Sequence, residues 1–129
     1  MFRSILCIAA GASLGATLRW MLSLAFNAAV PLIPMGTLLA NLVGGYLMGV
    51  MLGAVAFFPQ ISLEMKLFIV TGFLGSLTTF SAFSGEVVLL IQQRHFFAVF
   101  AMIALHVAGS LLMTGLGIAT FAFSLRFLR

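Results

Sequence analysis

Charged side chains are so scarce in this chain that they exclude a water-soluble fold. Only eight of the 129 residues are Lys, Arg, Asp or Glu, six of them basic and two acidic, and 64% of the residues are hydrophobic. A soluble domain carries about 25% charged residues, because its surface must stay hydrated. We therefore expect a bilayer to be the solvent, and we exclude a soluble enzyme, a nucleic-acid-binding module and a disordered segment. The net charge of +4 favours anchoring at a membrane surface over binding to nucleic acid.

Prolines and polar residues divide the sequence into four apolar segments. A helix needs about 20 apolar residues to cross a hydrocarbon core of roughly 30 Å. Prolines at positions 31, 34 and 59 cannot continue a helix, residues 60–66 form a polar loop, and residues 94–95 form another. An all-α membrane protein with four transmembrane helices is predicted, as one integral membrane domain over residues 1–129. The predicted spans are residues 5–26, 35–58, 67–93 and 96–125.

The third span contains a cluster of small and hydroxyl-bearing residues near its middle. The cluster consists of Gly72, Gly75, Ser76, Thr78 and Thr79. Glycine weakens a helix, and hydroxyls compete for its backbone hydrogen bonds. A helix broken inside the membrane exposes carbonyl and amide groups that bind ions. The cluster predicts either such a break near the midplane or a kink that packs on small residues.

Two other spans carry stripes of small or polar residues at four-residue spacing. In the second span the stripe consists of Thr37, Asn41, Gly45, Gly49 and Gly53. In the fourth span it consists of His106, Ser110 and Thr114. The glycines favour close packing of helices, within the chain or in a dimer. Asn41 must find partners away from lipid, in an interhelical hydrogen bond or along a permeation pathway. His106 is either a satisfied buried histidine or part of a polar track.

Aromatic and ionisable residues near the spans' interiors complete the candidate site. Phe80 and Phe83 share a helix face, where they serve ordinary packing or direct weakly positive ring edges at an anion. Arg19 is expected to reach the interface or to cap carbonyls, and Glu86 to lie in a hydrated vestibule. The sequence offers no paired carboxylates, no nucleophile with a base and no metal-ligand cluster. We therefore predict that the protein is not an enzyme.

The basic residues give only a small bias between the two sides of the membrane. Arg3, Lys66, Arg126 and Arg129 lie on one side of the predicted topology, and Arg94, with or without Arg19, on the other. The excess places both termini in the cytoplasm. So small a difference leaves the orientation weakly specified.

Three segments resemble motifs of the Fluc (CrcB-like) family of fluoride channels, which are small four-span membrane proteins of bacteria. The segments are residues 11–20, 36–44 and 72–83, and they occur in the family's order. The stripe of the fourth span adds to the likeness. Ala82 departs from the family pattern, which usually has Thr after Ser81, so a hydroxyl role at that position is absent.

This resemblance implies an antiparallel, dual-topology homodimer in the bacterial inner membrane, with two fluoride pores and a central sodium ion. Such a channel exports fluoride passively and relieves its toxicity. The backbone carbonyls of Gly75 and Thr78 from both subunits would hold the sodium. Arg19 would attract anions or orient the dimer. The fluoride pathway would be formed by neutral side chains, with Ser81 and His106 as weaker candidates than the rest: Asn41, Phe80, Ser81, Phe83, His106, Ser110 and Thr114.

Physical considerations favour neutral ligands for such an ion. A bare small anion in an apolar interior is unfavourable by roughly tens of kcal/mol without replacement ligands, yet conduction requires binding weak enough for release. Glu86 fits poorly, because a carboxylate at the pore mouth repels anions. One alternative is a small proton-coupled multidrug antiporter, a four-span dimer that requires a carboxylate in the first span; this first span has none. Another is a subunit that does not transport.

Overall fold

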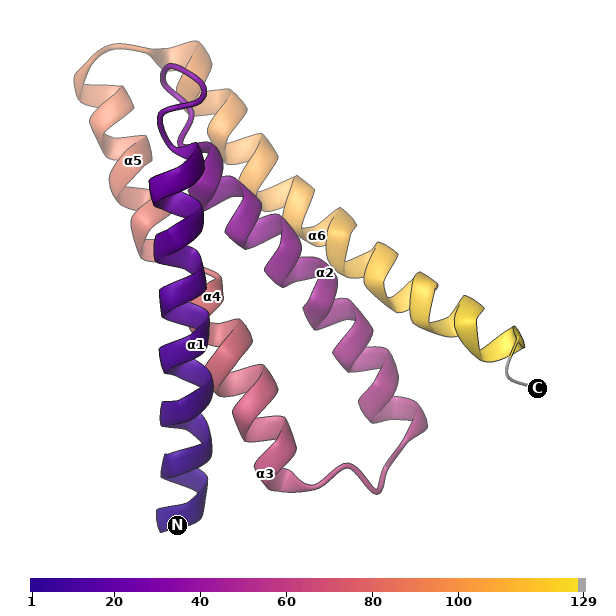
Figure 1. The fold of residues 1–129 in the computed structure, drawn as a ribbon. Coiled ribbons are helices and arrows are strands. Elements are labelled where there is room, and N and C mark those ends of the chain that lie inside the picture. The colour runs from indigo at the N-terminus through magenta and orange to yellow at the C-terminus, as the bar shows by residue number, and fades with distance from the viewer. Residues whose placement is uncertain (128–129) are drawn as a thin grey trace.

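The computed structural model describes residues 1–127 as a bundle of helices (Figure 1). Four helical segments are long and apolar enough to cross a membrane: α1 (Phe2–Phe26), α2 (Met35–Phe57), the segment Leu63–Gln92 and α6 (Phe96–Phe127). Within the described residues there is no β-strand. The predicted all-helical fold with four membrane-spanning segments is therefore confirmed. Arg129, expected on the side of the termini, lies outside the described residues.

The largest difference from the predicted spans is at the start of the third one. The prediction of a loop through residue 66 was wrong, because helix α3 (Leu63–Lys66) begins inside that segment. The hydroxyl of Ser62 accepts a hydrogen bond from the Met65 amide at 3.2 Å and caps the new helix. A serine at this position satisfies an amide that would otherwise lack a partner, so the helix starts before the apolar run does.

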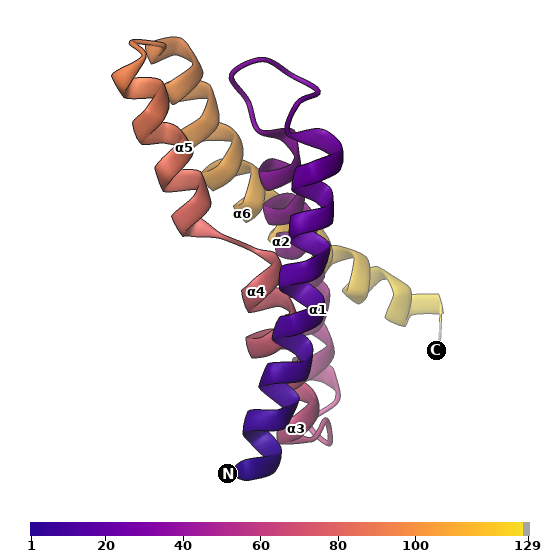
Figure 2. The ribbon, with the colours of Figure 1, turned by 60° about the vertical axis from the view of Figure 1, so that its left-hand side comes forward.

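The third span consists of two helical halves that are not collinear. After α3 the chain continues as a π-helix, η1 (Leu67–Leu74), and a single turn, α4 (Gly75–Leu77). Thr78 and Thr79 are both extended, and α5 (Phe80–Gln92) follows them. Figure 2 shows α5 displaced sideways from α4 at the end of this link. The structure thus contains the break that the glycine and hydroxyl cluster predicts, whereas the sequence did not indicate the π-helix.

The helices pack in two close pairs. Helix α1 packs mainly on η1 and α4, and α2 packs mainly on α6; Figure 1 shows each pair side by side. In the first pair Gly11 and Gly72 face each other, and a Cβ on either would overlap backbone of the opposite helix. Backbones approach this closely only where side chains are absent. The pairing fixes the first half of the third span against α1.

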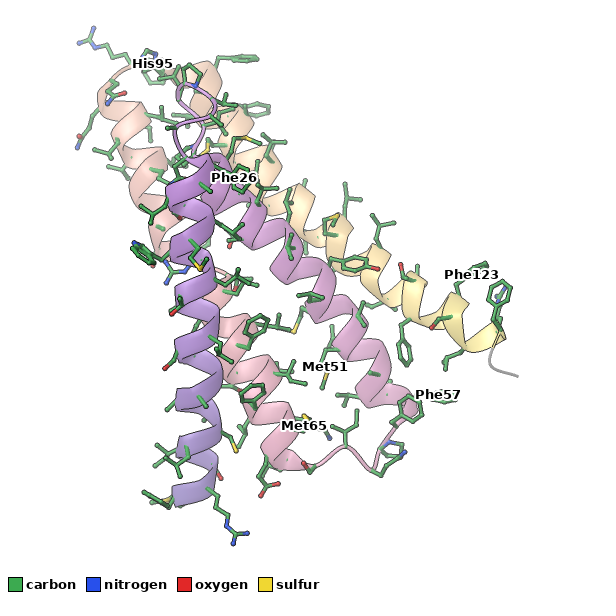
Figure 3. The ribbon with its side chains drawn as sticks, in the orientation of Figure 1. Phe26, Met51, Phe57, Met65, His95 and Phe123 are labelled. Carbon is green, nitrogen blue, oxygen red and sulfur yellow. The ribbon has the colours of Figure 1, made fainter. Side chains whose placement is uncertain are left out.

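The loops between the four spans lie at two opposite ends of the bundle. The N-terminus and the α2–α3 loop lie at one end, the α1–α2 loop and the α5–α6 turn lie at the other, and α6 runs sideways away from the second end (Figures 1 and 2). In Figure 3, Phe26 and His95 lie toward the second end and Phe57 toward the first, whereas Phe123 lies to one side on the outlying part of α6. Many large apolar side chains on the outer surface are exposed, such as Phe97 at 88%. An apolar outer surface of this extent suits lipid or another subunit.

Candidate ion pathway

The polar stripes of α2 and α6 meet the start of α5 around one cavity. Its volume is about 420 Å³. The lining includes most of the predicted pathway residues: Asn41, Phe80, Phe83, His106, Ser110 and Thr114. Residues far apart in sequence are therefore brought together as one set.

Ser81 is the predicted pathway residue that does not line this cavity. It is exposed on the first turn of α5, and its hydroxyl lies 3.3 Å from that of Thr79. The Thr79 hydroxyl also accepts the amide of Ala82 at 3.1 Å and so caps α5. Ala82, where the family pattern has Thr, is half-buried in the same turn.

Asn41 forms hydrogen bonds with the extended backbone at the break in the third span. Its Oδ1 accepts the Thr79 amide at 2.7 Å, and its Nδ2 donates to the Thr79 carbonyl at 3.0 Å. The same Nδ2 lies 2.9 Å from His106 Nδ1 on α6. Of the two sequence interpretations, the structure shows the interhelical hydrogen bond directly. Both hydrogens of the Asn41 amide are used, so this amide has no free N–H for another ligand in this conformation.

His106 and the two phenylalanines form an aromatic wall. The imidazole stacks on Phe83, with ring centroids 4.6 Å apart and planes at 23°. Phe83 in turn contacts Phe80 edge to face, with centroids 5.5 Å apart. Phe83 and His106 are buried, whereas 75% of Phe80 is exposed. The aromatic pair therefore separates the buried histidine from the open side of the subunit.

The glycines of α2 bring α6 within hydrogen-bonding distance. The Thr114 hydroxyl lies 3.0 Å from the Gly45 carbonyl and 2.9 Å from the Ser110 carbonyl, and it donates to them. A Cβ on Gly49 would overlap the Thr114 carbonyl, and one on Gly53 would press on the ring of Phe121. The structure thus places the three glycines at the α2–α6 contact within one subunit. Gly45 also lines the cavity, together with residues of α6.

The end of α4 presents carbonyl groups without their usual helical donors. A continuing α-helix would direct the Thr79 amide to the Gly75 carbonyl, but this amide donates to Asn41 instead. The Ser76 carbonyl accepts from Arg19 Nε at 3.0 Å. Arg19 therefore caps the broken helix, as one of its two predicted roles required. Gly75 is exposed and Thr78 is half-buried, and the sodium predicted at their carbonyls stays a prediction.

Glu86 does not line the cavity and lies in the middle of α5. Its Oε1 accepts the Thr37 hydroxyl at 2.7 Å, while Oε2 is buried without a partner among the described residues. Glu86 also lines a second cavity of about 270 Å³, together with Asn27 and Gln93. The sequence did not indicate the pairing of Thr37 with Glu86, although the position of Thr37 on the polar stripe of α2 was a usable signal.

The chain also matches known proteins over most of its length. Residues 6–118 match the family model described as "CrcB-like protein, Camphor Resistance (CrcB)". The chain belongs to the CrcB family. The family identification made from the three motifs is therefore confirmed.

Relatives in the CrcB family cover almost the whole chain. One from Pseudomonas putida (strain W619) is 54% identical over 126 residues, which covers 95% of this chain and 97% of the relative. One from Chromobacterium violaceum is 55% identical and covers 93% of this chain and 95% of the relative. One from Pseudomonas paraeruginosa is 56% identical, with 92% and 93% covered. All three are named "Fluoride-specific ion channel FluC", which lends no support to the multidrug antiporter alternative.

Proposed function

We propose that this chain forms a passive fluoride channel that exports fluoride across the bacterial inner membrane and so relieves fluoride toxicity. The observation that carries the proposal is the convergence of the two polar stripes and the aromatic pair on one cavity of about 420 Å³. The names of relatives that are 54–56% identical support the same function. Fluoride that enters the cell as neutral HF would leave by this path as the free ion.

The cavity suits a small anion because its polar groups are neutral. Ser110, Thr114, Phe80 and Phe83 line it, and no Lys or Arg is among its lining residues. Such groups lower the cost of removing an anion from water without the tight binding of a full positive charge. A bound ion therefore remains able to leave.

We further propose that two subunits assemble antiparallel in the membrane. A single subunit leaves Phe80 75% exposed at the cavity's edge, so one chain does not enclose the pathway. The small charge bias between the two ends of the bundle is consistent with insertion in both orientations. Lipid surrounds the remaining apolar surface.

A sodium ion would lie between the subunits at the carbonyls of Gly75 and Thr78. The diverted Thr79 amide frees the Gly75 carbonyl at this point. When bound, sodium supplies fixed positive charge beside the pathway. Replacing sodium with a large organic cation should lower the unfolding temperature of the detergent-solubilised dimer, and an unchanged temperature would contradict the site.

Efflux from liposomes tests the channel function directly. Purified protein in liposomes loaded with potassium fluoride should release fluoride when potassium ionophore is added, and liposomes loaded with chloride should retain it. Chloride release at the same rate, or no fluoride release, would contradict the proposal. If Asn41→Ala and Phe80→Ile both leave the measured flux unchanged, the subunit does not use this cavity for transport.

A further inference from the structure

One ring nitrogen of His106 is paired and the other is not. Nδ1 lies 2.9 Å from Asn41 Nδ2, whereas Nε2 is buried and has no hydrogen-bond partner among the described residues. The side chain is only 4% exposed and lines the cavity of about 420 Å³. Because buried polar groups in proteins are nearly always paired, the unpaired nitrogen requires an explanation.

The backbone of Thr79 fixes the orientation of the Asn41 amide. Asn41 Oδ1 accepts from the Thr79 amide, and Asn41 Nδ2 donates to the Thr79 carbonyl. Turning the amide by 180° would set N–H against N–H and oxygen against oxygen. The group that faces His106 is therefore the Nδ2 of Asn41, which donates hydrogen bonds and does not accept them.

The protonation of His106 follows from this constraint. Since Asn41 Nδ2 donates, His106 Nδ1 accepts, and the proton of the neutral imidazole is on Nε2. Stacking on Phe83 at 4.6 Å fixes the plane of the ring. The structure thus holds one buried N–H donor of fixed direction on a residue that lines the cavity, with no protein acceptor among the described residues.

We propose that the Nε2–H of His106 donates a hydrogen bond to permeating fluoride and that Asn41 is the positioning residue that fixes its tautomer. The inference rests on the proposed channel function. An unpaired donor recognises an acceptor, and fluoride is a strong acceptor about as small as water. Nε2 is covered in this conformation, so a neighbouring side chain has to move before fluoride reaches it. A neutral donor stabilises the ion without the charge that would trap it.

Three substitutions of His106 test its Nε2–H donor separately from its contact with Asn41. His106→Gln carries an amide N–H about as far as the imidazole Nε2, so it keeps the donor. His106→Asn reaches only as far as Nδ1, so it keeps an acceptor for Asn41 and loses the donor. His106→Phe retains stacking on Phe83 and loses both.

Fluoride efflux from liposomes should rank these variants. We expect His106→Gln to remain within about threefold of the wild-type rate, and His106→Asn and His106→Phe to lose about tenfold or more, the size expected for one hydrogen bond to a charged group. Wild-type flux in His106→Asn would show that only the contact with Asn41 matters and would overturn the donor role. Wild-type flux in His106→Phe would overturn the whole inference.

Nuclear magnetic resonance of the unmodified site gives a test that does not depend on how variants fold. In ¹⁵N-labelled His95→Gln protein in bilayers, only the His106 imidazole gives a histidine signal. We expect Nδ1 to be unprotonated and Nε2 protonated, and the Nε2–H signal to shift with sodium fluoride but not with sodium chloride. The opposite tautomer, or no response to fluoride in protein that conducts it, overturns the inference and leaves the channel function intact. Protein without fluoride flux contradicts the proposed function itself.

Discussion

Asn41 joins three parts of the chain that are distant in sequence. Its amide bonds to the backbone of Thr79 at the break and to His106 on α6. Within a membrane no water replaces a lost partner, so each of these bonds is costly to remove. One short side chain thereby stabilises the extended link and positions the wall of the cavity.

Replacing this side chain should affect both stability and transport. We expect Asn41→Ala to lower the free energy of unfolding by about 2–6 kcal/mol, because the amide and carbonyl of Thr79 lose their partner at about 1–3 kcal/mol each. Fluoride efflux should fall at least about tenfold as the donor network loosens. Thermal unfolding in detergent and liposome efflux measure the two effects.

Ser62→Ala provides a matched control for this substitution. It also removes a side-chain partner from a backbone amide, that of Met65, but at the start of α3 and far along the chain from the cavity. We expect a loss of about 1 kcal/mol in stability, typical of a helix cap, and wild-type efflux per folded protein. Equal loss of efflux in both variants would show that stability alone explains the effect of Asn41→Ala.

The guanidinium of Arg19 can act at the break in two ways, and substitutions of Arg19 distinguish them. Its Nε donates to the Ser76 carbonyl at 3.0 Å, and its charge attracts anions. If charge matters most, Arg19→Lys should keep efflux within about threefold of wild type, whereas Arg19→Gln should slow it about tenfold, most clearly at low salt where screening is weak. Efflux of both variants, measured at low and at high ionic strength, distinguishes the effect of the charge from that of the hydrogen bond. Equal rates in the two variants would exclude an electrostatic role.

At the scale of elements, the sequence revealed which segments are helical but not how they meet. Alternation of apolar runs and prolines was enough to find four spans, and the Gly–Ser–Thr cluster was enough to locate the break. The π-helix of residues 67–74 had no local signal in the sequence. It lies where Gly72 packs against Gly11 on α1, a contact that the sequence pattern does not reveal. The early start at Leu63 depended on one serine cap.

For the candidate site, too, the sequence revealed which residues share a helix face but not which residues pair across helices. Four-residue spacing identified His106, Ser110 and Thr114 as one face of a helix, and the structure places all three on the cavity. Spacing within a helix carries no information about partners on other helices. The pairs of Thr37 with Glu86 and of Asn41 with Thr79 therefore required the tertiary structure.

Two glycines on α6 provide a direct test of how tightly it packs on α2. A Cβ on Gly117 would overlap the Tyr46 carbonyl, whereas one on Gly115 would have no atom within 4 Å. Gly117→Ala should therefore separate the helices and cost about 2 kcal/mol or more, as overpacking of a core does. Gly115→Ala should be neutral or stabilise by up to about 1 kcal/mol, the helix-propensity gain.

Unfolding temperatures of the two variants measure this difference. Equal destabilisation by both would show that the exposed side of α6 at Gly115 is itself covered by another subunit. Little effect from Gly117→Ala would contradict the close approach of α2 and α6.

At the scale of the whole molecule, the scarcity of charge determines how the chain can insert. Arg3, Lys66 and Arg126 lie toward the end with the termini, and Arg94 lies in the turn at the opposite end. Lys and Arg near the ends of spans set orientation, because they resist translocation. With so small a difference, a few added charges should be enough to impose a single orientation.

This property allows a test of the antiparallel assembly. Gln92→Lys, Gln93→Lys and His95→Lys, combined with Arg3→Gln and Lys66→Gln, place the excess of basic residues at the Arg94 turn, whereas Gln60→Lys with Glu64→Gln increases the excess at the end with the termini. Each variant alone should insert mainly one way and protect cells from fluoride poorly, because the opposite partner is scarce. Co-expression should restore growth in fluoride to near the wild-type level. If either variant alone protects as well as wild type while labelling shows a single orientation, the functional assembly does not require antiparallel subunits.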